Sequence, residues 1–226
     1  VSDSVEPGMD QELEDPTATD QTGQDSGFQV DSIEYDGHRY HGGSSRSPND
    51  RWKAAYGRSH DTEDRFFLFE DGDLRFTHPL ENAGTLDGKA AVSNNGVSTV
   101  IDNLDREELS GKLYVYDPSG EQLLTHFFNA NVGTCTVSGD GSYAAAATLN
   151  PDCTTYIFDV EKGQKVVEHG NIDGNKMDLE FRNNSGLELY LSESRDEQPF
   201  YSIGLDGEPV WKSEELQRQE RLQQLM

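Results

Sequence analysis

Short runs of alternating apolar and polar residues recur along most of the chain, and turn signals rich in Gly, Asn and Asp separate them. The clearest series of turns ends at Asp50, Gly96, Gly141 and Gly186, so that successive turns are 46, 45 and 45 residues apart. Short runs with a period of two predict β-strands. A repeat of about 45 residues is typical of an array built from one supersecondary unit.

Each repeat predicts four strands separated by turns. In the second repeat the predicted strands are 90–92, 97–101, 113–116 and 122–128. A four-stranded meander has two faces to cover, and stacking several such sheets covers them, which is the architecture of a β-propeller. The pattern therefore predicts an all-β propeller with four blades, at about residues 42–87, 88–130, 131–173 and 174–212.

An additional hairpin is predicted before the first repeat, over residues 28–41. Phe28, Val30, Ile33 and Tyr35 precede Asp36-Gly37, and Asp-Gly between two β-prone runs is a strong hairpin signal. Because an open sheet edge invites association with other chains, we expect this hairpin either to complete a ring by pairing with the last blade or to cap an open edge.

The two ends of the chain have a different character. Residues 1–26 are rich in Asp, Glu, Gly, Thr and Gln and almost lack apolar residues, so they predict a disordered acidic tail. Residues 213–226 predict a helix, with Ser213 as its N-cap and Glu214 and Glu215 in the first turn. The domain of predicted blades therefore covers residues 27–212.

Two pairs of adjacent aromatic residues, Phe66-Phe67 and Phe127-Phe128, fall on predicted strands. Neighbours on a strand point to opposite faces of the sheet. Adjacent blades cover both faces of an internal sheet, so we expect an exposed ring only in a blade at the end of the array, where it would mark a contact surface.

The net charge of the chain narrows the classes of partner that it can bind. The formal net charge is −25, from 43 acidic against 18 basic residues. Nucleic-acid binding and docking on an anionic membrane need cations facing phosphates, so neither is expected. No apolar stretch approaches the roughly 18 residues of a membrane span. The acidic, lysine-poor composition resembles that of proteins from salt-loving archaea.

Several segments resemble β-propeller repeat families. The segments SGKLYVYDPSGEQLLTHF and TTYIFDVEKGQKVVEHG look like the third and fourth strands of WD40-type blades, with Tyr116-Asp117 and Phe158-Asp159 where such blades carry Trp-Asp. The segment YSIGLDGEPVWKSEE is similar to the quinoprotein-like (PQQ-like) repeat. The four predicted repeats depart from true WD40 repeats in lacking their Gly-His dipeptide and the Trp of the Trp-Asp pair. Such propellers usually have six to eight blades, so the resemblance implies a small closed propeller, part of a larger one, or half of a dimeric ring.

The sequence contains few candidate catalytic or ligand-binding residues. No Gly-x-Ser-x-Gly elbow or phosphate-binding glycine pattern is present, so we expect no catalytic or cofactor-binding residue. Carboxylates at turns can hold Ca²⁺, and the first blade offers a weak candidate set: Asp61, Glu63, Asp64, Asp71 and Asp73. Cys135 and Cys153 lie in one repeat, and they form either a disulfide or two buried thiols.

These observations favour a non-catalytic scaffold of a salt-adapted protein, which binds a protein partner or itself through its loops. The longest loops follow the second strands of the first two blades, and their candidate contact residues are Arg58, His60, Asp64, Asp105, Arg106 and Glu108. Two alternatives remain: blades of a larger propeller enzyme, quinoprotein-like or hydrolase-like, and a cell-surface cation-binding module. The cytoplasm is favoured slightly over the cell surface.

Overall fold

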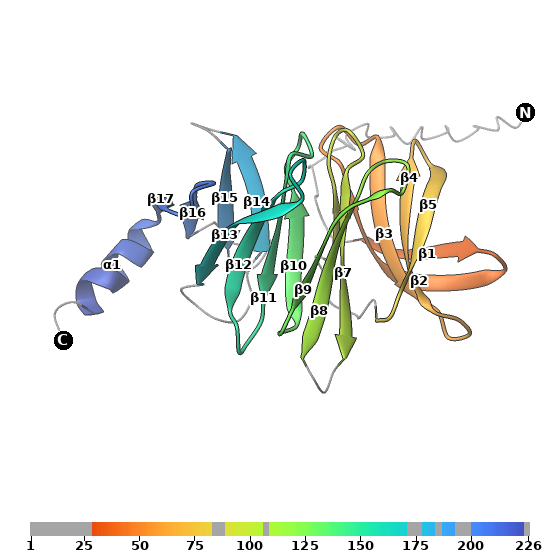
Figure 1. Ribbon diagram of the computed structural model, residues 1–226, viewed down its shortest axis with the longest axis horizontal. Helices are drawn as coiled ribbons and strands as arrows, with labels where there is room; N and C mark the ends of the chain where they lie inside the picture. The colour runs from red at the N-terminus through yellow and green to blue at the C-terminus, as the bar shows by residue number, and fades with distance from the viewer. Residues whose placement is uncertain are drawn as a thin grey trace, which may run out of the picture.

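The computed structural model describes residues 29–82, 89–105, 109–170, 178–183, 187–192 and 200–223. These residues form four antiparallel sheets and one helix, and in each sheet every strand pairs with its neighbours in sequence. The sheets follow one another along the chain as the blades of a propeller do, from right to left in Figure 1. The all-β propeller fold predicted from the sequence is therefore confirmed.

Blade 1 contains five strands: β1 (Gln29–Tyr35), β2 (His38–Arg46), β3 (Trp52–Arg58), β4 (Asp64–Glu70) and β5 (Asp73–Leu80). Blade 2 contains β6 (Ala90–Val92), β7 (Ser98–Asp105), β8 (Ser110–Tyr116) and β9 (Gln122–Phe128). Blade 3 contains β10 (Val132–Val137), β11 (Tyr143–Thr148), β12 (Thr154–Asp159) and β13 (Gln164–Gly170). Blade 4 contains β14 (Asp178–Asn183), β15 (Leu187–Ser192), β16 (Tyr201–Ile203) and β17 (Pro209–Lys212).

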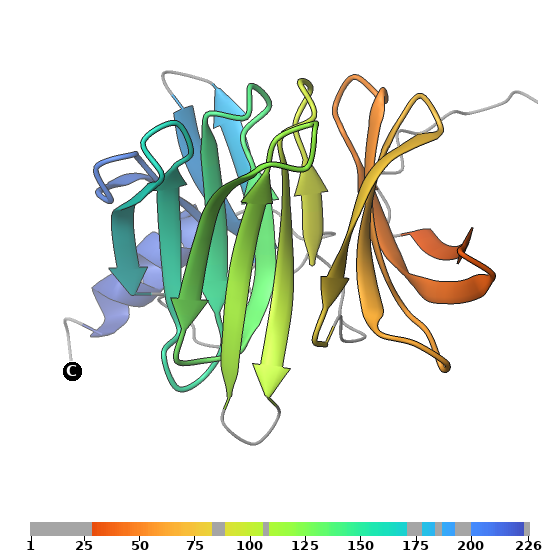
Figure 2. The same cartoon turned by 45° about the vertical axis from the view of Figure 1, so that its right-hand side comes forward.

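The inner strands of neighbouring blades pack against one another. Strands β2 and β3 contact β6, β6 and β7 contact β10, and β10 and β11 contact β14. Among the described residues, the strands of blade 1 make no comparable contact with those of blade 4. The two end blades lie at opposite ends of the molecule in Figures 1 and 2, so the four blades form an open arc and not a closed ring.

Apolar residues fill the spaces between the blades. The alanine run of β11 shows how both faces of an inner strand are used: Ala144 and Ala146 belong to the core shared with blade 2, whereas Ala145 and Ala147 belong to the core shared with blade 4. All four side chains are at most 3% exposed. Small residues are needed here because two neighbouring sheets converge on this strand.

The turns between the first and second strands hydrogen-bond to one another from blade to blade. In the Asn49 side chain, Nδ2 donates to the carbonyl oxygen of Asn94 at 3.0 Å, and the Asn94 backbone N–H donates to the carbonyl of Gly139 at 2.9 Å. The side chain of Asn95 donates to the carbonyl of Asp140 at 2.8 Å. Each bond joins residues 45 positions apart, so the sequence period is also the spacing of direct contacts between blades.

The N-terminal hairpin covers the outer face of blade 1. Strand β2 continues past the predicted end of the hairpin at residue 41 and pairs with β3, so the hairpin is continuous with the sheet of blade 1. Tyr40 and Tyr35 pack edge-on against Phe67, with ring centroids 5.1 and 5.7 Å away, and Phe67 is 0% exposed. The alternative in which the hairpin pairs with the last blade is therefore wrong. The apolar outer face of blade 1 is the nearest surface on which the hairpin can bury its apolar side chains. The first repeat begins at residue 38 and not at 42.

The helix α1 (Glu214–Gln223) follows blade 4 directly. The Ser213 side chain accepts a hydrogen bond from the Leu216 N–H at 3.3 Å, as expected of an N-cap, and Leu216 is buried in the core between blades 3 and 4. Residues 224–226 of the predicted helix and the predicted tail at 1–26 lie outside the described residues. No helix in the described part of the chain is long and apolar enough to cross a membrane.

Candidate functional site: an aromatic groove between blades 2 and 3

The loops predicted to bind a partner join the second and third strands of blades 1 and 2. Arg58 ends β3 and Asp64 begins β4, and their side chains form an ion pair with an Nε–Oδ2 distance of 3.5 Å. His60 is exposed between them, and β7 ends at Asp105. Two further predicted loop residues lie outside the described residues: Arg106 and Glu108. The ends of β3 and β7 lie at the lower edge of Figure 2, and we call this edge the loop rim.

The acidic residues of blade 1 do not converge. Asp61, Glu63 and Asp64 lie at one end of β4, whereas Asp71 and Asp73 follow its other end. A strand of seven residues separates the two groups by roughly 20 Å. Within the described ranges, no group of three or more His, Cys, Asp or Glu residues is arranged to hold a metal ion. The five acids therefore do not share one cation position.

The two cysteines are both thiols, and the disulfide considered as one alternative is not formed. Cys135 is buried in β10, in register with Ala146 of β11. Cys153 is partly exposed in the turn between β11 and β12, with a φ of +47°. One residue thus belongs to the core between blades 2 and 3, and the other belongs to the end of the sheet.

A groove of about 360 Å³ opens between the end of β9 and blade 3, at the loop rim. Its aromatic wall is built by His126 and Phe128 of β9 with Tyr156 of β12, and Phe127 also lies at its edge. Phe128 lies 5.1 Å from Tyr156 and 4.7 Å from His126 between ring centroids, and it is buried. Phe127 is 52% exposed. The groove therefore has a fixed aromatic wall on one face of β9, and the Phe127 ring is exposed on the other face.

Asp152 supplies the negative charge of the groove. Its Oδ2 accepts hydrogen bonds from the hydroxyls of Thr148 and Tyr156, both at 2.8 Å. Burial and this neighbouring carboxylate raise the pKa of the Tyr156 phenol, so the hydroxyl stays protonated and donates. Neutral donors thus fix the position of Asp152 in the turn between β11 and β12.

The remaining charges of the groove balance one another. Lys165 forms an ion pair with Glu168, and its ammonium lies 5.2 Å from the centroid of the Tyr156 ring. Burial lowers the pKa of His126, and the nearby Lys165 lowers it further. The imidazole is therefore neutral at pH 7, and the charged side chains that line the groove are Asp152 and Lys165.

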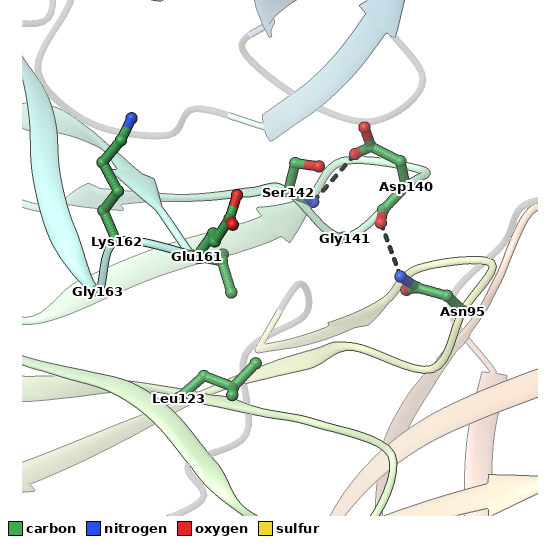
Figure 3. Close-up of a pocket in the computed structure, with 9 residues that line it drawn as sticks. Asn95, Leu123, Asp140, Gly141, Ser142, Glu161, Lys162 and Gly163 are labelled. Atoms are coloured by element: carbon green, nitrogen blue, oxygen red, sulfur yellow. Dashed lines mark hydrogen bonds between the residues drawn. The ribbon is translucent and has the colours of Figure 1, made fainter.

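A second groove, of about 580 Å³, lies at the opposite end of the same two blades (Figure 3). It is lined by turns, and Figure 3 shows Asp140 accepting hydrogen bonds from the Ser142 N–H and, through its carbonyl, from Asn95. Lys162 forms an ion pair with Asp159 at 2.6 Å. These groups are used in contacts within and between the blades, and the bond from Asn95 to Asp140 joins blade 2 to blade 3 at this end.

Two buried ionisable residues, Asp102 and Lys89, lie near the inner strands. The carboxylate of Asp102 accepts hydrogen bonds from the backbone N–H groups of Glu81 and Asn82, at 3.0 and 2.7 Å. Lys89 is 1% exposed, and burial lowers its pKa to about 8 against the opposing influence of Cys135 and Asp102. Neither residue lines the two grooves described above. Asp102 therefore holds the start of the connection between blades 1 and 2.

The exposed ring of Phe127 departs from the sequence-based expectation. We expected an outward aromatic ring only in an end blade, yet Phe66 and Phe67 of blade 1 are both fully buried. The hairpin covers the outer face of blade 1, whereas Phe127 lies on β9, the outer strand of an internal blade, and is 52% exposed there. The adjacent pair Phe127-Phe128 was the available signal, but the pattern alone could not tell which blade would expose a ring.

No protein-family model matches the sequence, and no curated protein matches it. Among solved structures, the chain is similar to the Dos1 propeller, with a TM-score of 0.49 and 12% identity over 71% of this chain and 42% of that chain. It is also similar to Kuenenia stuttgartiensis hydrazine synthase, with a TM-score of 0.49 and 14% identity over 74% of this chain and 47% of that chain. The chain spans less than half the length of either structure.

Proposed function

We propose that this chain is a non-catalytic β-propeller module that binds a protein partner at the loop rim through the end of β9, where the aromatic groove opens. The single observation that carries the proposal is Phe127, whose ring is 52% exposed on one face of β9, while the aromatic wall of the groove lies on the other face. Large aromatic residues dominate the energetics of protein interfaces, and they act from the centre of contact patches. The groove is open on the side of the predicted binding loops.

We also propose which family of propeller repeats the blades belong to. We assign the blades to the WD40-like group, because Asp117 and Asp159 each begin the turn between the third and fourth strands. The Asp117 Oδ1 accepts bonds from the N–H groups of Ser119 and Glu121, both at 2.8 Å. The Asp159 Oδ1 accepts a bond from the Lys162 N–H at 2.9 Å. An aspartate at this position caps the turn by accepting backbone N–H bonds.

We further propose that the protein works in concentrated salt. A net charge of −25 on 226 residues produces strong self-repulsion at low ionic strength. This repulsion is screened when the Debye length falls to about 3 Å at 1 M salt.

The two alternative functions gain no specific support. The acids proposed for a cation site lie at the two ends of β4, and the buried residues Lys89 and Asp102 line neither described groove. We therefore develop only the interaction module.

The test is a selection from a random peptide display library against the folded protein. We expect the enriched peptides to bind the Phe127→Ala variant at least about tenfold more weakly than the wild type. The matched control is Leu123→Ala, because Leu123 is 36% exposed on the same strand but at its other end. Enriched peptides that bind the Phe127→Ala variant as tightly as the wild type would overturn the proposal.

A further inference from the structure

The outer strand of each blade carries one large side chain on the face that points away from the preceding blade. In every blade the pairing of the third and fourth strands shifts once, and the fourth-strand residue paired just before the shift is Phe76, Leu124, Val167 or Trp211. The first three pack in the cores shared with the following blade. Trp211 holds the same position in blade 4, where it is 43% exposed.

The turn between the third and fourth strands of the following blade supplies the cover at this position. A Cβ atom on Gly120 would lie 2.9 Å from Cγ of Phe76, and one on Gly207 would lie 3.1 Å from Cγ1 of Val167. The equivalent turn of blade 1 carries Gly72, and nothing in the described part of the chain lies within 4 Å of a Cβ atom there. One end of the arc thus has an outer strand without a covering turn, and the other end has a turn without an outer strand to cover.

The open face of blade 4 has the composition of a protein interface. Tyr190 and Trp211 both pair with Ser202 across the sheet, and their ring centroids are 6.1 Å apart. The Arg182 guanidinium lies 4.7 Å from the centroid of the Tyr190 ring, and its Nε donates to Glu180 at 2.9 Å. Trp, Tyr and Arg are the residues that most often dominate binding at interfaces. After β17 the chain forms the helix α1, which leaves Trp211 exposed.

The complementary end of the arc carries an exposed apolar residue beside the uncovered turn. Leu74 follows Gly72 by two residues, pairs with Phe69 on the face away from blade 2, and is 40% exposed. The residues at the corresponding position of the other blades are less apolar: Gln122, Lys165 and Pro209. The hairpin covers Phe67 on this face but lies nearer the loop rim than the β4–β5 turn does in Figure 2. Leu74 is therefore accessible to a second chain.

We propose that a second copy of this chain covers the open face of blade 4. Trp211 of one copy packs on the β4–β5 turn and on Leu74 of the other copy, and the same contact forms again with the roles exchanged. Two arcs of four blades then close a ring of eight, a number found among β-propellers. A contact between two different surfaces gives a finite assembly when the ring closes. This surface is separate from the loop rim, so the proposal goes beyond the proposed function.

The experiment measures the mass of the wild type by sedimentation equilibrium over a range of protein concentrations in 1 M KCl. High salt is needed because each copy carries a net charge of −25, and screening reduces the repulsion between copies. We expect a dimer that dissociates on dilution. Tryptophan emission should move to shorter wavelength as the dimer forms, because Trp211 becomes buried whereas Trp52 is buried already.

Three variants locate the contact. Trp211→Ala should raise the dissociation constant of the dimer at least about tenfold, and Leu74→Ser should raise it in the same direction. The matched control is Val166→Ala, because Val166 is 38% exposed on the outer strand of an internal blade and should leave the constant unchanged. An equimolar mixture of Trp211→Ala and Leu74→Ser keeps one intact contact in the mixed dimer, so it should contain more dimer than either variant alone.

A monomer at every concentration, or assemblies that keep growing beyond a dimer, would overturn the proposal. A dimer that Trp211→Ala weakens but Leu74→Ser does not would also overturn it, because blade 4 would then be covered by something other than blade 1. Circular dichroism checks that each variant is folded; if one is not, the other variant and the emission of the wild type decide. The display selection tests the loop rim independently, since it depends on Phe127.

Discussion

Replacing Gly96 by alanine should destabilise the protein through the contact between blades 1 and 2. Gly96 lies in the turn between β6 and β7 with a φ of +86°, and a Cβ atom there would lie 2.7 Å from ring atoms of Trp52. Trp52 is 5% exposed in the core shared by the two blades. The added methyl group therefore meets a buried ring that has little room to move.

The expected loss of unfolding free energy in Gly96→Ala has two parts. Any alanine in the left-handed region costs about 1–2 kcal/mol of folding free energy, and forcing a methyl group into a packed core adds about 1–3 kcal/mol. Gly72→Ala isolates the first part, because Gly72 has a φ of +92° and nothing within 4 Å of the added Cβ. We expect Gly72→Ala to lose about 1–2 kcal/mol and Gly96→Ala to lose at least about 1 kcal/mol more.

The measurement is urea unfolding at fixed high salt, followed by circular dichroism and by tryptophan emission. The free energy of unfolding of each variant is obtained by linear extrapolation, and the slope is compared with that of the wild type to check that unfolding still occurs in one step. A shift in the emission of buried Trp52 before unfolding would show that the ring has moved in Gly96→Ala.

Equal losses in the two variants would refute the reasoning. They would show that only the backbone conformation matters at Gly96 and that the Trp52 ring moves aside without a measurable change in free energy. The contact between the turn of one blade and the core of the preceding blade would then not stabilise the array.

Two further predictions concern charge. The folded-state pKa of Lys89 is about 8, below the ordinary 10.5, so the unfolded chain binds more protons between these values and stability rises with pH across this window. Lys89→Met should therefore gain up to about 3 kcal/mol of unfolding free energy at pH 7 and show a smaller gain at pH 9.5; a gain that is the same at both pH values would contradict this. Adding KCl should raise the thermal unfolding midpoint of the wild type by about 10 °C or more, since a few kcal/mol of relieved repulsion correspond to that shift. Most of the rise should occur below 1 M, where screening saturates, and a midpoint that does not change with salt would remove the evidence for salt adaptation.

The sequence predicts the strands and turns of the blades because their signals are local. Alternating apolar residues and Gly, Asn or Asp turns depend only on neighbours along the chain, and the predicted strands 113–116 and 122–128 lie within β8 and coincide with β9, respectively. The 45-residue period is also visible in the sequence, because equivalent turns such as those of Asn49 and Asn94 contact each other directly.

The candidate site could be predicted only in part from the sequence. The rim of loops between second and third strands follows from the order of strands in a meander. The groove does not, because it requires β9 of blade 2 to lie beside β12 of blade 3 and the turn that carries Asp152. These segments belong to different blades, so their distance depends on how the sheets stack.

The sequence by itself determined an array of β-sheet blades, an acidic surface and the helix that follows the blades, because each depends on local pattern or composition. Only the tertiary structure decided that the array is an open arc, that the hairpin covers blade 1 and that Phe127 is left exposed on an internal blade. Those outcomes depend on which apolar face each segment packs against. The local pattern does not show which segments are neighbours in space, so it cannot show which faces are buried.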